Sequence, residues 1–125
     1  MSATVYILGD ADKVRQRVEG ALLAHDFDGL AKFSADLTAA VSLIARRTVE
    51  ILSAEIVMAG GDDLLLVTSA DQFDSDALGR LARSFADETG CTISFGVGST
   101  VEEAYLRLRR AKASGGGSIS VGSLA

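Results

Sequence analysis

Two short runs of strand-forming residues stand only four residues apart, and this spacing constrains the fold more than any other feature of the sequence. The runs are residues 55–59 (EIVMA) and 64–68 (LLLVT), separated by residues 60–63 (GGDD). Glycine and aspartate suit the backbone angles that tight turns require, so the segment is predicted to be a β-hairpin. The fold must therefore contain an antiparallel strand pair, with the other segments arranged around it.

The remaining segments have the periodicity of strands and helices in alternation. Strands are expected at residues 4–8, 92–98 and 118–121, and helices at residues 13–24, 29–53, 74–88 and 101–113. Asp12 is expected to cap the first helix. Asp74 or Ser75 would cap the third, and Ser99 or Thr100 the fourth, because their side-chain oxygens can accept hydrogen bonds from free backbone amides.

The order of these elements, βααββαβαβ, determines the expected fold class. It contains the βαββαβ arrangement of ferredoxin-like α+β folds, in which an antiparallel sheet carries its helices mainly on one face. A chain of 125 residues has room for one hydrophobic core. Residues 1–125 are therefore expected to form a single domain of this class.

The composition excludes several kinds of site. One cysteine (Cys91) and one histidine (His25) leave no material for a disulfide framework, a thiolate cage or a multi-histidine metal site. Cys91 is expected to be half-buried, His25 exposed, and Met58 part of the core. The net charge of −5 argues against a nucleic-acid partner. No apolar run is long enough to cross a membrane and no signal peptide is evident, so a cytoplasmic location without membrane contact is expected.

Five charged residues are predicted to meet at one edge of the sheet. Asp10 and Asp12 follow the first strand, and Asp62 and Asp63 lie in the hairpin turn. In a ferredoxin-like topology the first strand ends at the edge where the central hairpin turns. The last helix runs back towards that edge, so Lys112 in its final turn is expected to approach the carboxylates.

A cluster of carboxylates is costly unless a cation neutralises it. Carboxylate and carbonyl oxygens are the ligands that Mg²⁺ or Mn²⁺ prefers, commonly shared with substrate phosphates. Two such ions can activate a hydroxyl and stabilise a leaving pyrophosphate. The alternative is that these segments are ordinary polar turns, in which glycine and aspartate are common.

Four motifs in this order resemble a known group of proteins. GDAD ends the first strand, AKFSADL contains a Phe-Ser pair, MAGGDDLLL spans the hairpin, and ISFGVGSTVEEAYLRLRRAKASGGGSI closes the chain. Together they resemble the palm domain of nucleotide cyclases and polymerases, which includes GGDEF diguanylate cyclases and the palm of the large type III CRISPR subunit. Within that group the sequence is most similar to the minimal CRISPR polymerases, which are stand-alone palm domains.

The resemblance implies roles for the acidic residues. Asp10 and the Ala11 carbonyl would be metal ligands, and Asp62 and Asp63 would complete a site for Mg²⁺ or Mn²⁺, expected to hold two ions. Asp10, Asp62 and Asp63 would be the catalytic residues. One of the two turn aspartates would help to deprotonate the attacking hydroxyl.

The resemblance also implies a nucleotide pocket. Ser34, Gly60 and Gly61 would line it, and Lys112 would hold the triphosphate of the substrate. Without the resemblance, a serine on a helix face such as Ser34 is most simply an ordinary surface residue.

Three departures argue against an ordinary diguanylate cyclase. The turn reads GGDD followed by Leu64 and lacks the Glu-Phe pair of GGDEF, no R-x-x-D inhibitory motif precedes it, and the chain is shorter than a usual GGDEF domain. A second basic residue often follows the lysine in these families, whereas residues 115–117 (GGG) stand here. Arg109 or a partner subunit could supply the missing charge.

The resemblance predicts a metal-dependent nucleotidyltransferase. It would join nucleoside triphosphates, with ATP favoured, into a cyclic di- or oligonucleotide for anti-phage signalling, and a separate effector would sense the product. A homodimer or higher oligomer is expected, because one palm has one metal site and cyclisation needs two bonds. The alternatives are a non-catalytic nucleotide- or metal-sensing palm, a GGDEF-like diguanylate cyclase, and a ferredoxin-like interaction module.

Overall fold

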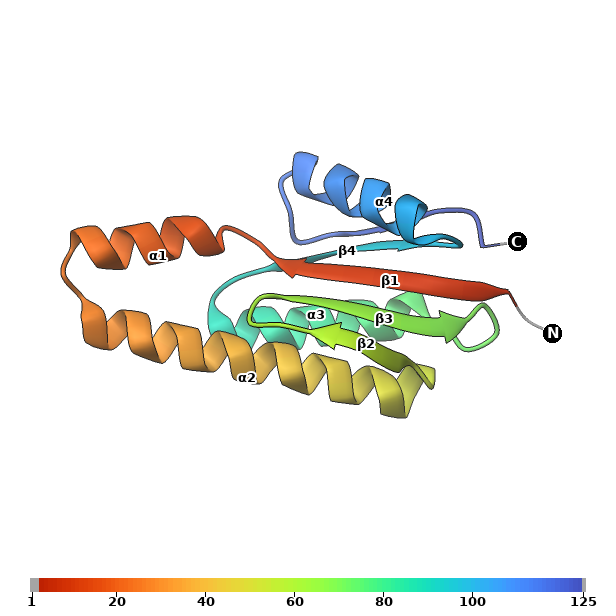
Figure 1. The fold of residues 1–125 in the computed structure, drawn as a ribbon, viewed down its shortest axis with the longest axis horizontal. Helices are drawn as coiled ribbons and strands as arrows, with labels where there is room; N and C mark the ends of the chain where they lie inside the picture. Colours follow the sequence, from red (N-terminus) through yellow and green to blue (C-terminus); the bar gives the residue numbers. More distant parts are fainter. Residues whose placement is uncertain (1–2, 125) are drawn as a thin grey trace.

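The strand Thr4–Ala11 (β1) runs through the middle of a five-stranded sheet (Figure 1). The computed structural model describes residues 3–124. The other strands are Glu55–Ala59 (β2), Asp63–Ser69 (β3), Ile93–Gly98 (β4) and Ile119–Val121 (β5). Their order is β2-β3-β1-β4-β5, and every neighbouring pair is antiparallel except β4 and β5, which are parallel. The predicted hairpin is confirmed as the β2–β3 pair.

Four helices complete the described part of the chain. They are Val14–Leu23 (α1), Phe27–Leu52 (α2), Ser75–Thr89 (α3) and Val101–Ala113 (α4). This α+β palm-like arrangement confirms the predicted fold class. No helix in residues 3–124 combines the length and apolarity needed to cross a membrane.

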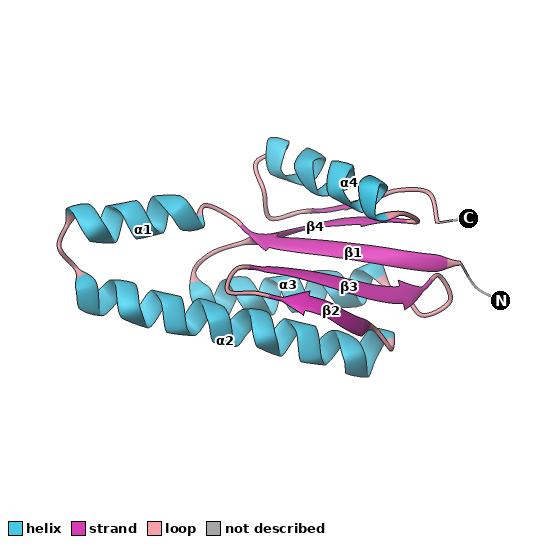
Figure 2. Ribbon diagram, in the orientation of Figure 1, coloured by secondary structure: helices cyan, strands magenta, loops and turns pink. Residues whose placement is uncertain are grey.

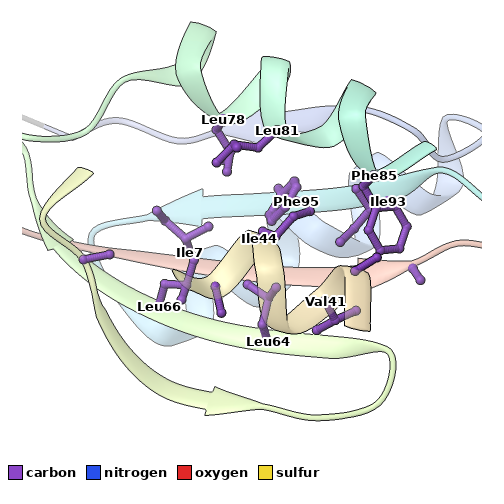
Figure 3. Packing of buried hydrophobic residues seen from close by; sticks show 14 of the residues in the cluster. Ile7, Val41, Ile44, Leu64, Leu66, Leu78, Leu81, Phe85, Ile93 and Phe95 are labelled. Carbon is purple, nitrogen blue, oxygen red and sulfur yellow. The ribbon is translucent and has the colours of Figure 1, made fainter. Parts of the chain in front are cut away.

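The hydrophobic core lies between the sheet and the pair α2 and α3 (Figure 3). Alternate strand residues face it, because successive side chains of a strand point to opposite sides. Ile7 of β1, Leu66 of β3 and Phe95 of β4 are fully buried there. The helices contribute apolar residues at helical spacing, such as Val41 and Phe85. This packing fixes the direction in which the odd and even positions of β1 point.

Helix α4 packs on the opposite face of the sheet, across β4 and β1 (Figure 2). The expectation that helices gather mainly on one face therefore holds for α2 and α3 only. Gly96 of β4 explains the close approach of α4: a Cβ at this position would meet the backbone of Ala104 and Leu108. Glycine thus lets the helix pack directly on the strand, which sets where its C-terminal turn lies.

Two helix starts and one helix end follow the sequence signals. Asp74 accepts hydrogen bonds from the amides of Asp76 and Ala77 at 3.0 and 3.2 Å. Thr100 accepts one from the Glu103 amide at 3.1 Å. Gly90 ends α3 with a left-handed φ of 73°. The boundaries of α3 and α4 therefore lie within one residue of those predicted.

Three expectations about single residues are wrong. Met58 is 44% exposed, because β2 is an edge strand that α2 leaves largely uncovered. Asp12 does not cap α1: the N-cap is Lys13, with a φ of 59° and no side-chain cap. Cys91 is fully buried rather than half-buried. His25 is exposed, as expected.

Helix α1 and the first turns of α2 project beyond the sheet, past the end of β1 (Figure 1). No residue of α1 is buried. Val14 and Val18 pack only at the margin of the core, whereas Leu22 and Leu23 are exposed. The projection begins next to the sheet edge at which the acidic residues were predicted to meet.

Candidate active site

Asp10 and Asp63 stand opposite each other at the end of the sheet. They are register partners across the antiparallel β1–β3 pair, so their side chains point to the same face, which is the face that carries α4. The turn is tied to the end of β1 by a hydrogen bond of 2.8 Å from the Ala11 amide to the Asp62 carbonyl. The structure thus brings together the carboxylates at Asp10, Asp62 and Asp63.

The turn glycines allow this geometry. Gly60 donates its amide to the Asp63 carbonyl at 2.8 Å. A Cβ at Gly60 would lie 2.6 Å from a carboxylate oxygen of Asp63, so any larger residue would displace that side chain. Gly61 faces α2. A Cβ added at Gly61 would have the Thr38 hydroxyl of α2 as its nearest neighbour, at 3.9 Å.

Electrostatics at the edge disfavour the ionised form of Asp10. Burial raises the pKa of its carboxyl above the ordinary value of 3.8, and the charges of Asp62 and Asp63 add to the increase. Lys112 opposes the increase without cancelling it. A further cation at this edge would therefore be stabilised by charges that the fold holds close together.

Lys112 lies against the end of β1, as the topology predicted. Its Nζ donates to the carbonyls of Asp10 and Ala11 at 3.1 and 3.0 Å and to Oδ1 of Asp12 at 2.7 Å. Oδ2 of Asp10 is also 3.1 Å away. Four oxygen atoms thus converge on one cationic nitrogen.

Asp12 shares Lys112 with Asp10 but differs from the other aspartates in its burial and hydrogen bonding. It is 4% exposed, and its carboxylate accepts hydrogen bonds from Thr92, Ser94, Lys112 and the Gly117 amide. Burial acts to raise the pKa of Asp12, but the four hydrogen bonds outweigh it and lower the pKa below 3.8. Its oxygens are already fully engaged, so the idea that Asp12 belongs to an acidic cluster open to metal is wrong.

A cavity of about 420 Å³ opens beside this edge. Asp10, Ala11, Asp62 and Lys112 line it together with Arg109, which the sequence offered as a source of the missing positive charge. The other lining residues were not predicted: Lys13, Val14, Arg15, Tyr105 and Leu108. One wall is therefore acidic and the other basic. The i, i+4 and i+7 spacing of Tyr105, Arg109 and Lys112 was the sequence signal that they share a helix face.

Ser34 does not line this cavity. It is exposed on α2, one helical turn before Thr38, which is the α2 residue that faces Gly61. The structure places Ser34 on the side of the hairpin turn away from α4. A pocket containing Ser34, Gly60 and Gly61 would thus adjoin the acidic edge from the α2 side, while Lys112 adjoins it from the α4 side.

The donor set at the edge suits a hard divalent cation in part. The Asp10 carboxylate and the Ala11 carbonyl both face one point, because both contact Nζ of Lys112. Residues 3–124 contain no group of three or more His, Cys, Asp or Glu side chains placed to hold one metal ion. Asp62 and Asp63 are close enough to raise the pKa of Asp10, but the three carboxylates do not form such a group.

Comparison with known proteins identifies the family of this chain. The sequence model of the minimal CRISPR polymerase domain (mCpol) matches residues 6–121. The chain belongs to the minimal CRISPR polymerase family. The matched range of this chain includes Asp10, Asp63 and Lys112. No curated protein sequence matches the chain significantly.

Solved structures share the fold of this mCpol domain. A Csm1-Csm4 cassette in complex with cA4 superposes with a TM-score of 0.70 at 21% identity, over 97% of this chain and 21% of that one. The chain thus spans about a fifth of that relative. The GGEEF domain of a Vibrio cholerae diguanylate cyclase gives a TM-score of 0.60 at 13% identity, over 99% and 85% of the two chains.

A third similar structure is the GGDEF domain of DgcB from Caulobacter crescentus in complex with c-di-GMP. Its TM-score is 0.61 at 10% identity, over 96% of this chain and 78% of that one. The mCpol chain therefore shares its fold with these structures.

Proposed function

We propose that this mCpol domain is a nucleotidyltransferase that joins nucleoside triphosphates, with ATP favoured, into a cyclic di- or oligonucleotide. The observation that carries the proposal is the pairing of Asp10 with Asp63 beside the Gly60-Gly61 turn. It places carboxylates on the face that also carries Lys112. The proposal places the triphosphate on this face, at the ends of the strands.

The proposed reaction forms one phosphodiester bond for each triphosphate consumed. A ribose hydroxyl attacks the α-phosphorus, the bond from that phosphorus to the bridging oxygen breaks, and pyrophosphate leaves. Asp10, the Ala11 carbonyl, Asp62 and Asp63 would hold Mg²⁺ or Mn²⁺, with two ions expected. When bound, the metal would neutralise phosphate charge and lower the pKa of the hydroxyl. Asp63 accepts the hydroxyl proton, and Gly60 and Gly61 let the nucleotide approach the turn, with Ser34 beside it.

A second copy of the chain is part of the proposal. Closing a cyclic dinucleotide needs two phosphodiester bonds, whereas each chain has one acidic edge. A homodimer or higher oligomer with facing sites would supply both. The product would act in cytoplasmic anti-phage signalling through a separate effector.

The test is product formation from the four NTPs with Mg²⁺ or Mn²⁺, followed by mass spectrometry. We expect a cyclic product from the unmodified chain and a loss of at least about 100-fold for Asp63→Ala, because the lost carboxylate both binds metal and accepts the proton. Asp87→Ala, which removes an exposed carboxylate on α3, is the matched control and should keep full activity. Absence of product with both metals would reject the enzyme.

One observation favours a second candidate, a nucleotide-sensing palm without turnover. Nζ of Lys112 sits among the oxygens of Asp10 and Ala11 that were expected to bind metal. A domain of this kind would bind nucleotide without consuming it. Binding of NTP with Mg²⁺ in the absence of any product would support it, whereas absence of both would leave a ferredoxin-like interaction module.

A further inference from the structure

The positive charge of Lys112 is already neutralised by contacts within the fold. An ammonium group has three protons to donate, and four oxygen atoms from residues 10–12 lie within 3.1 Å of Nζ. Two of these oxygens belong to carboxylates, so the charge of the lysine is more than balanced locally. Lys112 is therefore poorly placed to be the main ligand of a triphosphate.

The glycine turn after α4 cannot provide the missing cation. Gly116 has a φ of 80°, and a Cβ there would lie 2.8 Å from the carboxyl carbon of Asp12. Its amides are also in use: those of Gly115 and Gly116 donate to carbonyls of α4 at 3.1 Å, and that of Gly117 donates to Asp12 at 2.7 Å. Neither side chains nor free amides are available to a phosphate in this turn.

Arg109 lies on the same wall of the cavity, and its positive charge is not neutralised by an ion pair. It precedes Lys112 by three residues, so both lie on the same side of α4, and both line the 420 Å³ cavity with Asp10. Among residues 3–124 no carboxylate forms an ion pair with Arg109. Lys13 and Arg15, from the junction of β1 and α1, line the same cavity. Neither forms an ion pair with a described residue.

We propose that Arg109 holds the terminal phosphates of the bound nucleotide, whereas Lys112 is a positioning residue that fixes the end of β1. This inference rests on the proposed function and specifies its substrate-binding wall. The α-phosphate would lie at the acidic edge and the β- and γ-phosphates towards Arg109, with Lys13 and Arg15 flanking them. A guanidinium group suits this task because its planar fork matches two phosphate oxygens at once.

Binding measurements separate the two roles without requiring turnover. Calorimetric titrations would use inorganic tripolyphosphate, ATP and AMP, each with Mg²⁺. We expect Arg109→Gln to weaken binding of tripolyphosphate and ATP by about 10- to 100-fold, the loss of one charge-assisted contact, while leaving AMP binding unchanged. Arg110→Gln is the matched control, because Arg110 is an exposed neighbour on α4 outside the cavity lining. It should bind all three ligands as the unmodified chain does.

Lys112→Gln is expected to behave in the opposite way. It should lower the melting temperature of the ligand-free protein, because two carboxylates lose their partner, while changing tripolyphosphate affinity by no more than about threefold. In assays of product formation, the substitution should lower kcat and leave KM unchanged. Lys112→Arg, which keeps the charge, should restore part of the lost melting temperature and kcat.

The outcomes distinguish this inference from the proposed function. Unchanged tripolyphosphate affinity in Arg109→Gln, or a loss confined to Lys112→Gln, overturns the inference even if the unmodified chain makes a cyclic product. Selective weakening in Arg109→Gln supports it even if no product forms. Failure of the unmodified chain to bind ATP and tripolyphosphate overturns both.

Discussion

At the scale of single residues, the burial of Asp12 is the feature with the clearest energetic consequence. Its hydrogen-bond partners lie 80 to 105 positions further along the chain. They come from β4, its preceding residue, the end of α4 and the glycine turn. One carboxylate therefore joins three segments at the edge of the sheet, and the stability of that edge depends on its negative charge.

Replacing Asp12 by Asn should reduce the free energy of unfolding by about 2–4 kcal/mol at neutral pH, because a buried charged acceptor is lost and Lys112 keeps only Asp10 as an ionic partner. The effect should depend on pH. The folded state lowers the pKa of Asp12 below 3.8, so its stabilisation is complete above that value and is lost as the pH falls through the lower, folded-state pKa.

Chemical denaturation of both proteins across acidic pH would measure this dependence. The difference in unfolding free energy should stay constant near neutrality and shrink below pH 3.8. Asp87→Asn, at an exposed position on α3, is the control and should show no such dependence. A difference that persists unchanged in strong acid would contradict the assignment.

How much of the site could be predicted from the sequence differs between residues for physical reasons. The meeting of Asp10 with the hairpin turn followed from topology alone, because an antiparallel pair must bring a strand end to its neighbour's turn. The fate of Asp12 did not, because it depends on Ser94 and Gly117, which no local pattern links to it. In the basic wall, Lys13 and Arg15 were not predicted. Arg109 was named only as a possible source of the missing charge, because it reads locally as one of several charges on a solvated helix.

At the scale of elements, α1 differs from the rest of the fold. It has no buried residue, whereas α2 and α3 bury whole stripes. Sequence periodicity predicted that this helix exists but not that it is exposed. A weak apolar stripe does not show whether another element packs against it. Its amides should therefore exchange with solvent at lower free-energy cost than those of β1 and β3, which open only when the sheet does.

Gly20→Ala should stabilise α1 by about 0.5–1 kcal/mol, because glycine costs backbone entropy inside a helix and a Cβ at this position meets nothing within 4 Å. Hydrogen exchange of the α1 amides would report the change as slower exchange. Gly29→Ala is a control that should destabilise its helix, α2, because the added Cβ would meet the Asp26 carboxylate that caps α2. Faster exchange of α1 in Gly20→Ala would count against this account.

At the scale of the whole molecule, the two walls of the cavity belong to different layers. The acidic wall is carried by β1 and the β2–β3 turn. The basic wall is shared between α4, on the face opposite the main core, and the junction of β1 and α1 (Figure 2). The packing of α4 on β4, β1 and β5, together with the contacts of Lys112 at the end of β1, holds the two walls at a fixed separation. The sequence predicted both elements, but not the face on which α4 lies.

Gly96→Ala tests this coupling. The added Cβ would meet the α4 backbone, including the Cα of Leu108 at 2.8 Å, so α4 must shift and the stability should fall by about 1–3 kcal/mol. Tripolyphosphate binding should weaken as well, because Arg109 moves with the helix. Thermal unfolding and calorimetry would measure the two effects. Gly79→Ala in α3, where a Cβ meets Arg83 at an ordinary 3.6 Å, should cause neither.

The burial of the single cysteine makes the chain selectively labelable. Cys91 is 6% exposed, so thiol reagents should reach it poorly and react slowly with the folded protein. Leu23, at the end of α1, is 83% exposed. A Leu23→Cys variant should therefore take one fluorophore on the projecting helix. Energy transfer between labelled copies would then report whether two chains come together when nucleotide is added.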